Sequence, residues 1–149
     1  MGREARIKLS SRDLGDNMYE QAKERIFSDE DTRITPVAAN VIERIRARYP
    51  DIPSDYLAFL GEVGWGTIAM AYVIYESPKR PSEIYGKDFA PILDELILFG
   101  DNMAGRCAGF DVNTWKVVEV LPGGQSSLSR WANFQEFVEH IIGSIFKTG

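Results

Sequence analysis

The sequence predicts an α+β fold, and three observations support this class. Amphipathic segments with helical spacing dominate residues 17–63, whereas segments rich in β-branched and aromatic residues recur between 67 and 128. One further amphipathic segment follows at 133–146. Helices and strands are therefore segregated along the chain, unlike the regular alternation that builds a parallel sheet. The length of 149 residues suits one domain.

The N-terminal part of the chain predicts one short helix. Asn17 followed by Glu20 forms a capping-box pattern, in which the two side chains satisfy each other's backbone N–H groups. We expect this helix to run to Phe27. The acidic run at 29–31 indicates a solvated linker after it.

Two further helices are predicted before the first strand. Thr35 is a favourable N-cap for a helix that ends at Tyr49, because Pro50 disfavours helical backbone in the residue before it. The next helix spans 53–63, and Gly64 is suited to end it with a positive φ angle. The short turn between them predicts a tight pair of helices.

Five strands are predicted between these helices and the last one. Residues 77–91 contain three prolines and one glycine, which indicate a long irregular connection. Asn113 and Thr114 form the expected hairpin turn between two of the strands. The predicted strands are 67–76, 96–99, 106–112, 117–121 and a short one at 126–128.

The last helix has a second capping-box pattern, Asn133 followed by Glu136. Apolar residues at helical spacing, from Phe134 to Phe146, predict a buried stripe. The only histidine, His140, falls on the polar side of this helix, so we expect it to be exposed.

Composition limits the classes of partner and the cellular compartment. The 17 basic and 22 acidic residues give a formal charge of −5, whereas duplex-binding domains usually carry a basic surplus. Nucleic acid is therefore not an expected partner. No apolar run approaches the roughly 20 residues that span a bilayer, and none follows Met1 as a secretory signal would. A single cysteine forms no internal disulfide, and we expect a cytoplasmic protein.

The sequence contains no pattern typical of a catalytic or metal site. One histidine and one cysteine do not supply the ligands of a usual zinc site, so we expect no metal and no cofactor. Cys107 lies in a predicted strand, where a buried structural thiol is the favoured interpretation. We therefore predict that the chain is not an enzyme.

Four residues are candidates for contact with a partner. Trp65 lies between two glycines and either covers the core or anchors an interface. Asp101 and Asn102 lie in the glycine-bearing loop 100–105, which is a turn between strands that also offers polar groups to a ligand. Trp115 follows a predicted hairpin turn, where a large aromatic side chain is not easily buried.

Several of these segments resemble the SMI1/KNR4 family of the SUKH superfamily. The stretch from Ile52 to Leu60, followed by Gly64-Trp65-Gly66, is similar to the opening signature of the family. The segment Leu98-Phe99-Gly100-Asp101-Asn102 resembles the Phe-Gly-Asp/Asn-Gly segment of the family. Phe110-Asp111 resembles the end of the next strand in the family. Trp131, Phe134 and Phe137 match its closing helix. Residues 1–33 have no counterpart, so we expect an N-terminal extension at 1–33 and the family-like domain at 34–149.

The resemblance implies helices packed on one face of a largely antiparallel or mixed sheet. Bacterial relatives are regarded as immunity proteins that neutralise polymorphic toxins, whereas fungal relatives act as interaction hubs. We therefore expect a non-catalytic protein-binding module, most simply an immunity protein, whose acidic charge suits a basic nuclease toxin. Two alternatives remain open. One is a regulatory module with a non-toxin partner selected by residues 1–33, and the other is a small-molecule-binding protein that uses Asp101, Asn102 and Cys107.

Overall fold

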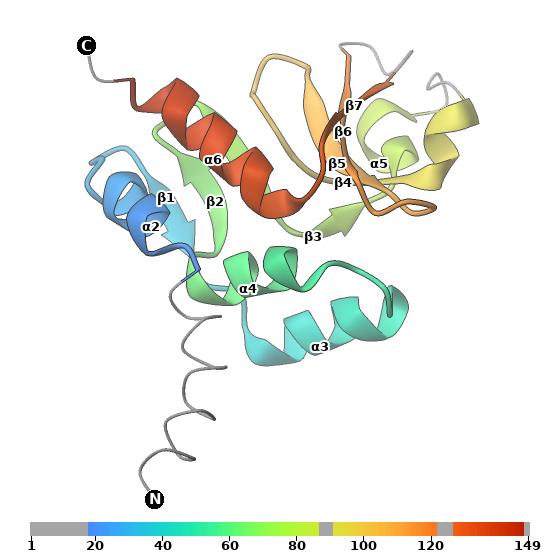
Figure 1. Ribbon diagram of the computed structural model, residues 1–149, viewed down its shortest axis with the longest axis horizontal. Coiled ribbons are helices and arrows are strands. Elements are labelled where there is room, and N and C mark those ends of the chain that lie inside the picture. Colours follow the sequence, from blue (N-terminus) through green and yellow to red (C-terminus); the bar gives the residue numbers. More distant parts are fainter. Residues whose placement is uncertain (1–17, 87–90, 122–126, 148–149) are drawn as a thin grey trace, which may run out of the picture.

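Seven strands form one antiparallel sheet in the computed structural model, which describes residues 18–86, 91–121 and 127–147. Each strand pairs with the next one along the chain, so the sheet is a meander from one edge to the other (Figure 1). The strands are β1 (Arg33–Thr35), β2 (Trp65–Ile68), β3 (Tyr72–Lys79), β4 (Leu96–Asp101), β5 (Cys107–Asp111), β6 (Val117–Val120) and β7 (Ser127–Trp131).

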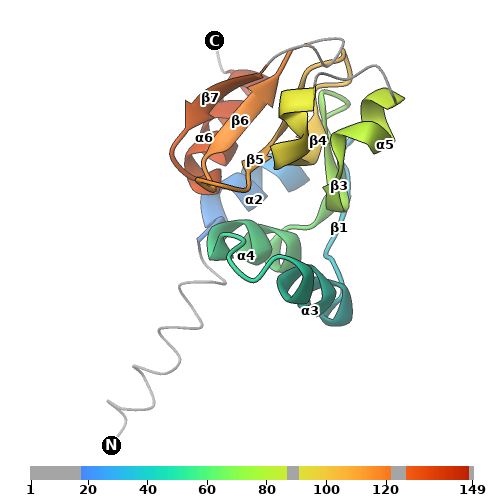
Figure 2. The same ribbon diagram turned by 90° about the vertical axis from the view of Figure 1, so that its right-hand side faces the viewer.

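Helices cover both faces of this sheet, and the longer ones lie together. They are α2 (Glu20–Phe27), α3 (Ala39–Arg48), α4 (Ser54–Glu62), α5 (Pro81–Tyr85), the 3-10 segment η2 (Pro91–Glu95) and α6 (Phe134–Ile145). One face of the sheet is covered by α2, α4 and α6, and α3 packs beside α4 and β3. The opposite face carries α5 and η2, as Figure 2 shows. This arrangement confirms the predicted α+β class.

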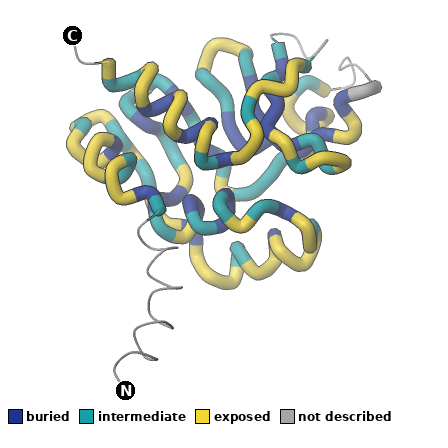
Figure 3. Tube along the Cα trace, viewed as in Figure 1, coloured by how far each residue is buried: buried dark blue, intermediate teal, exposed yellow. Residues whose placement is uncertain are grey.

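The main core lies between the sheet and helices α4 and α6, and aromatic rings dominate it. Tyr56 and Phe59 of α4, Phe99 of β4 and Phe134 of α6 are fully buried. The ring centroid of Phe99 lies 4.9 Å from that of Phe134 and 5.8 Å from that of Tyr56. Ring pairs at such distances add about 0.5–1.5 kcal/mol beyond the burial of their area. The buried segments in Figure 3 follow this layer.

The described part of the N-terminal segment packs on the same core. Tyr19, immediately before α2, and Ile26 within it are buried in the main cluster. Asn17, the predicted cap of this helix, lies outside the described residues. The acidic run at 29–31 forms the turn between α2 and β1, as the sequence predicts for a solvated connection.

A smaller second core fills the opposite face of the sheet. Its buried members are Leu93 of η2 and five residues of β4, β5 and β6: Leu96, Leu98, Cys107, Val118 and Val120. Tyr85 of α5 packs at its edge. The connection predicted as irregular at 77–91 therefore contains a short helix, which begins at Pro81 because a proline in the first turn lacks only an N–H that has no partner there.

Two further predicted elements differ from the observed ones. The helix predicted from Thr35 begins at Ala39 instead, because Thr35 pairs with Trp65 as the last residue of β1. The single strand predicted at 67–76 is two strands, β2 and β3, separated by a tight turn. Ala69 and Met70 form that turn with φ angles of 52° and 56°, which residues other than glycine and asparagine rarely adopt.

Several predicted ends are confirmed. Gly64 follows α4 with φ of 126°, and its N–H donates to the carbonyl of Phe59 at 2.9 Å. The side chain of Asn133 accepts a hydrogen bond from the N–H of Glu136 at 2.9 Å and so caps α6. No helix within the described residues is long and apolar enough to cross a membrane.

Candidate partner-binding face

An open hollow of about 600 Å³ lies between α6 and one end of the sheet. One wall of the hollow is formed by the sheet and is lined by Tyr72, Asn102 and Glu119. The other wall is formed by β7 and α6 and is lined by Trp131 and His140. The turn between β2 and β3 and the turn between β4 and β5 meet at this end of the sheet, because the first residues of β3 pair with the last residues of β4. We call this hollow and its two turns the turn face.

The turn between β2 and β3 presents an exposed methionine. Positive φ angles at Ala69 and Met70 reverse the chain within two residues. The N–H of Ala69 donates to the hydroxyl of Thr32 at 3.0 Å, and the N–H of Ala71 donates to the carbonyl of Ile68 at 2.8 Å. With its backbone fixed in this way, Met70 is 62% exposed.

The turn between β4 and β5 is held by the two polar candidates. One carboxylate oxygen of Asp101 accepts from the N–H of Met103 at 2.7 Å. The side-chain oxygen of Asn102 accepts from the N–H groups of Ala104 and Arg106, at 2.9 and 3.1 Å. Both side chains therefore shape the turn, and Asn102 also lines the hollow. Met103 stands at its tip, 50% exposed and with φ of 64°.

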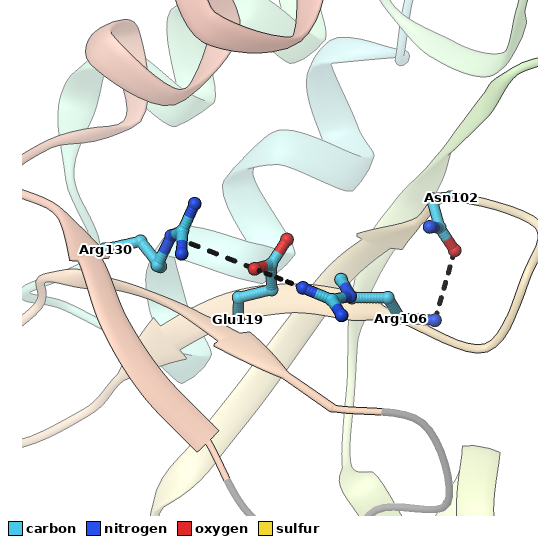
Figure 4. A network of polar contacts seen from close by, with 4 residues as sticks. All are labelled: Asn102, Arg106, Glu119 and Arg130. Atoms are coloured by element: carbon cyan, nitrogen blue, oxygen red, sulfur yellow. Dashed lines mark hydrogen bonds and ion pairs between the residues drawn. The ribbon is translucent and has the colours of Figure 1, made fainter.

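A charged network borders the hollow on the sheet (Figure 4). Glu119 of β6 accepts from Arg106 at 3.2 Å and lies 3.8 Å from the guanidinium of Arg130. The carboxylate side chain is only 17% exposed, whereas the two arginines are 40% and 43% exposed. Glu119 thus holds two half-exposed cations in place. The sequence pattern did not single out Glu119 as a functional residue. The available signal was a single charged position in an otherwise aliphatic strand.

Trp131 and His140 form the wall opposite this network. The indole of Trp131 packs edge-on against Phe137, with ring centroids 5.2 Å apart. The imidazole of His140 also lies 5.2 Å from it. Arg130 lies over the indole at 5.4 Å. Trp131 is half-buried at the edge of the main core, and His140 is exposed as predicted.

The four predicted contact residues do not form one site. Asp101 and Asn102 lie together in the turn between β4 and β5. Trp115 lies in the turn between β5 and β6, which is at the other end of the strands from the turn between β4 and β5. Its ring packs on Phe110, with ring centroids 5.8 Å apart. Trp65 stands in β2 with 39% of its surface exposed and belongs to neither core cluster.

Cys107 lies on the other side of the sheet from the hollow. It is 3% exposed in the second core, and burial raises the pKa of its thiol. A buried protonated thiol is a poor nucleophile at neutral pH. Asp101 pairs with Cys107 across β4 and β5, and its second carboxylate oxygen accepts from the hydroxyl of Tyr75 at 2.7 Å, which itself lies 4.0 Å from the sulfur of Cys107. Asp101 and Cys107 therefore lie on the same side of the sheet, whereas Asn102 lines the hollow on the other side. The described residues contain no group of three or more His, Cys, Asp or Glu side chains that could hold a metal ion.

No protein-family model matches this chain, and no curated protein matches it. The features that require a functional explanation are the two exposed methionines of the turn face, Met70 and Met103, and the hollow beside them.

Proposed function

We propose that this chain is a non-catalytic protein-binding module of the SMI1/KNR4 type, which acts in the cytoplasm as an immunity protein and neutralises a cognate toxin by covering it. The observation that carries the proposal is the exposure of Met70 and Met103 on two adjacent turns. Methionine is flexible and polarisable, and it is over-used on surfaces that bind other proteins. Large apolar side chains grouped beside a hollow are typical of interaction sites.

The backbone of the turn face is organised before any partner arrives. Side chains of Thr32, Asp101 and Asn102 accept hydrogen bonds from the backbone of the two turns. A surface whose loops are already ordered loses little conformational entropy on binding. This supports a binding role for the turn face, with the methionines as adaptable contacts on fixed turns.

Charge supports a basic partner. The chain carries a formal charge of −5, and Asp29 of the acidic run at 29–31 lines the hollow. Arg106 and Arg130 are partly neutralised by Glu119, which lies between them. Complementary charge accelerates association and disfavours wrong partners, so a basic nuclease is the toxin class we favour.

The sequence resemblance supports the family assignment. The segment similar to the opening signature forms α4, whose Tyr56 and Phe59 are central to the core. The segment similar to Phe-Gly-Asp/Asn-Gly forms the end of β4 and the turn that carries Asp101 and Asn102. The resembling residues thus build both the main core and part of the turn face.

Affinity purification tests this proposal. The tagged full-length protein is recovered from its native cells, and its partners are quantified by mass spectrometry. We expect a toxin-like protein in near-stoichiometric amount, which the double variant Met70→Asp/Met103→Asp fails to recover. Ile84→Asp is the control, because Ile84 is an apolar residue, 38% exposed, in α5 on the opposite face of the sheet. Cells that express the recovered toxin should stop growing, and co-expression of the wild-type protein should restore their growth.

A second candidate function is favoured by the size of the hollow. Its volume of about 600 Å³ falls within the range of small-molecule pockets, about 300–1,000 Å³. Trp131, His140 and Asn102 offer it an aromatic wall and polar groups. A metabolite that bound there would raise the melting temperature, since a ligand of the native state adds RT ln(1 + [L]/Kd) to stability. A thermal-shift screen with a metabolite collection distinguishes this role from protein binding.

A further inference from the structure

A second groove lies at the other end of β3 from the turn face. It has a volume of about 650 Å³ and runs between α3 and the last part of β3. Figures 1 and 2 show α3 beside this part of the sheet and away from α6. The groove therefore does not share its walls with the hollow, and a role for the groove does not depend on the function proposed for the turn face.

One face of α3 forms the helical wall of the groove. Five of the lining residues are three or four positions apart, so they lie on a single face of α3 and of the residue that follows it. They are Val41, Arg44, Ile45, Arg48 and Tyr49. The three apolar members pack against the main core, with Ile45 buried and Val41 and Tyr49 half-buried. Arg44 and Arg48 are exposed. The groove thus has an apolar floor and a basic rim.

The opposite wall is a free edge of β3. Pairing between β2 and β3 reaches only as far as Ile74, so no strand of the described chain flanks Glu76, Ser77 and Pro78 on that side. Pro78, within this stretch, has no N–H to offer to a further strand. A partner is therefore held here mainly through side chains, and not by extending the sheet.

The two arginines of this groove lack an internal counter-charge. Arg46, the third arginine of α3, pairs with Glu43 at 2.7 Å. Within the part of the chain that the structure describes, no carboxylate pairs with Arg44 or Arg48, and Arg48 only lies over the ring of Tyr49 at 5.4 Å. Arg44 and Arg48 therefore leave positive charge without an internal partner along one helix face of a protein whose formal charge is −5.

We infer that this groove docks a segment of a partner protein that inserts one large apolar side chain and carries carboxylates on the side facing α3. The apolar floor accepts the anchor residue, and Arg44 and Arg48 attract the acidic residues. Glu76 on the opposite wall repels carboxylates, so the acidic residues must lie toward α3. Residues 1–17 of this chain, with four basic and three acidic side chains, do not have this charge.

Synthetic peptides and fluorescence polarisation test this inference on the full-length protein. Each labelled peptide carries a central Phe or Leu flanked by acidic residues, by their amides or by lysines. We expect the acidic peptides to bind at least about ten-fold more tightly than the amide versions, and Arg44→Glu/Arg48→Glu to remove that preference. Glu76→Gln should strengthen binding of the acidic peptides about two- to three-fold, because it removes the repulsion.

Arg46→Glu is the matched control for long-range charge. It changes the net charge as much as Arg48→Glu does, but Arg46 does not line the groove. Only Arg48→Glu should therefore weaken binding substantially. Equal losses from both variants, or no preference for acidic peptides, would overturn the inference. A wild-type dimer in sedimentation that Arg44→Glu/Arg48→Glu dissociates would also overturn it, by assigning the groove to a second copy.

Discussion

The hydroxyl of Tyr19 donates a hydrogen bond of 2.7 Å to the backbone carbonyl of Asp55, 36 residues away in the sequence. The backbone N–H of Tyr19 donates to the carboxylate of Glu62 at 3.1 Å. Asp55 and Glu62 lie at the two ends of α4, so one residue joins the start of α2 to the whole length of α4. The carboxylate of Asp55 also accepts from the N–H of Gln135 at 3.0 Å, which adds α6 to the same polar seam.

Tyr19→Phe tests this seam against a matched tyrosine. The change removes one hydrogen bond and keeps the buried ring, so the free energy of unfolding should fall by about 1 kcal/mol. Tyr56→Phe should do the opposite, because the hydroxyl of Tyr56 is buried and has no hydrogen-bond partner among the described residues. Removing it should stabilise the fold by about 1 kcal/mol. Urea unfolding measures both, and equal losses would show that neither hydroxyl has the role assigned to it.

Gly64→Ala should destabilise the protein by more than about 2 kcal/mol. Its φ angle of 126° is strained for any residue with a Cβ, and that atom would lie 2.1 Å from the carbonyl oxygen of Thr35. Gly143→Ala is the control, since it lies in α6 and its Cβ would meet nothing within 4 Å. That change should stabilise the helix by about 0.5–1 kcal/mol. Thermal unfolding of the two variants should therefore shift in opposite directions.

The thiol of Cys107 should react slowly in the native protein. Burial raises its pKa from the ordinary value of 9.0, and only the thiolate is nucleophilic. Alkylation by iodoacetamide should be at least about ten-fold slower in buffer than in denaturant. Since the folded pKa is the higher one, the stability that the neutral thiol contributes is complete below pH 9.0 and is lost as the pH rises toward the raised pKa. Equal reaction rates in both conditions would contradict burial of the thiol.

Trp65→Ala separates the two interpretations of this exposed indole. Trp65 packs in neither core cluster, so the change should alter the free energy of unfolding by less than about 1 kcal/mol. If Trp65 anchors a partner, the variant should bind the recovered partner more weakly by well over about 1 kcal/mol. Isothermal titration calorimetry measures that difference. An unchanged affinity with the fold intact would remove Trp65 from the interface.

Local signals predicted most of the helical ends and the order of the elements. The caps at Asn133 and Gly64 and the stop before Pro50 depend on neighbouring residues alone, so the sequence was sufficient to identify them. β1 was not predicted, because three residues carry little periodicity and Thr35 is equally suited to cap a helix. The turn at Ala69-Met70 was also missed, since its positive φ angles are imposed by tertiary pairing and not by glycine.

The candidate site could be predicted only in part. Asp101 and Asn102 were identified because turn residues cluster in their loop, and both do shape that turn. The opposite wall, with Trp131 and His140, depends on how α6 crosses the sheet, which no local pattern specifies. For the same reason the sequence did not indicate that Trp65 and Trp115 lie at the other end of the strands from Asn102.

Quantitative affinity purification of three proteins tests the central claim, that this chain acts by binding another protein through its turn face. The proteins are the wild type, Met70→Asp/Met103→Asp and Arg44→Glu/Arg48→Glu, each checked for native folding by circular dichroism. We predict that the wild type recovers one partner in near-stoichiometric amount and that the methionine variant recovers at least about ten-fold less. Undiminished recovery with the methionine variant, or no stoichiometric partner of the wild type, would contradict the claim. Loss with the arginine variant alone would instead assign binding to the groove beside α3.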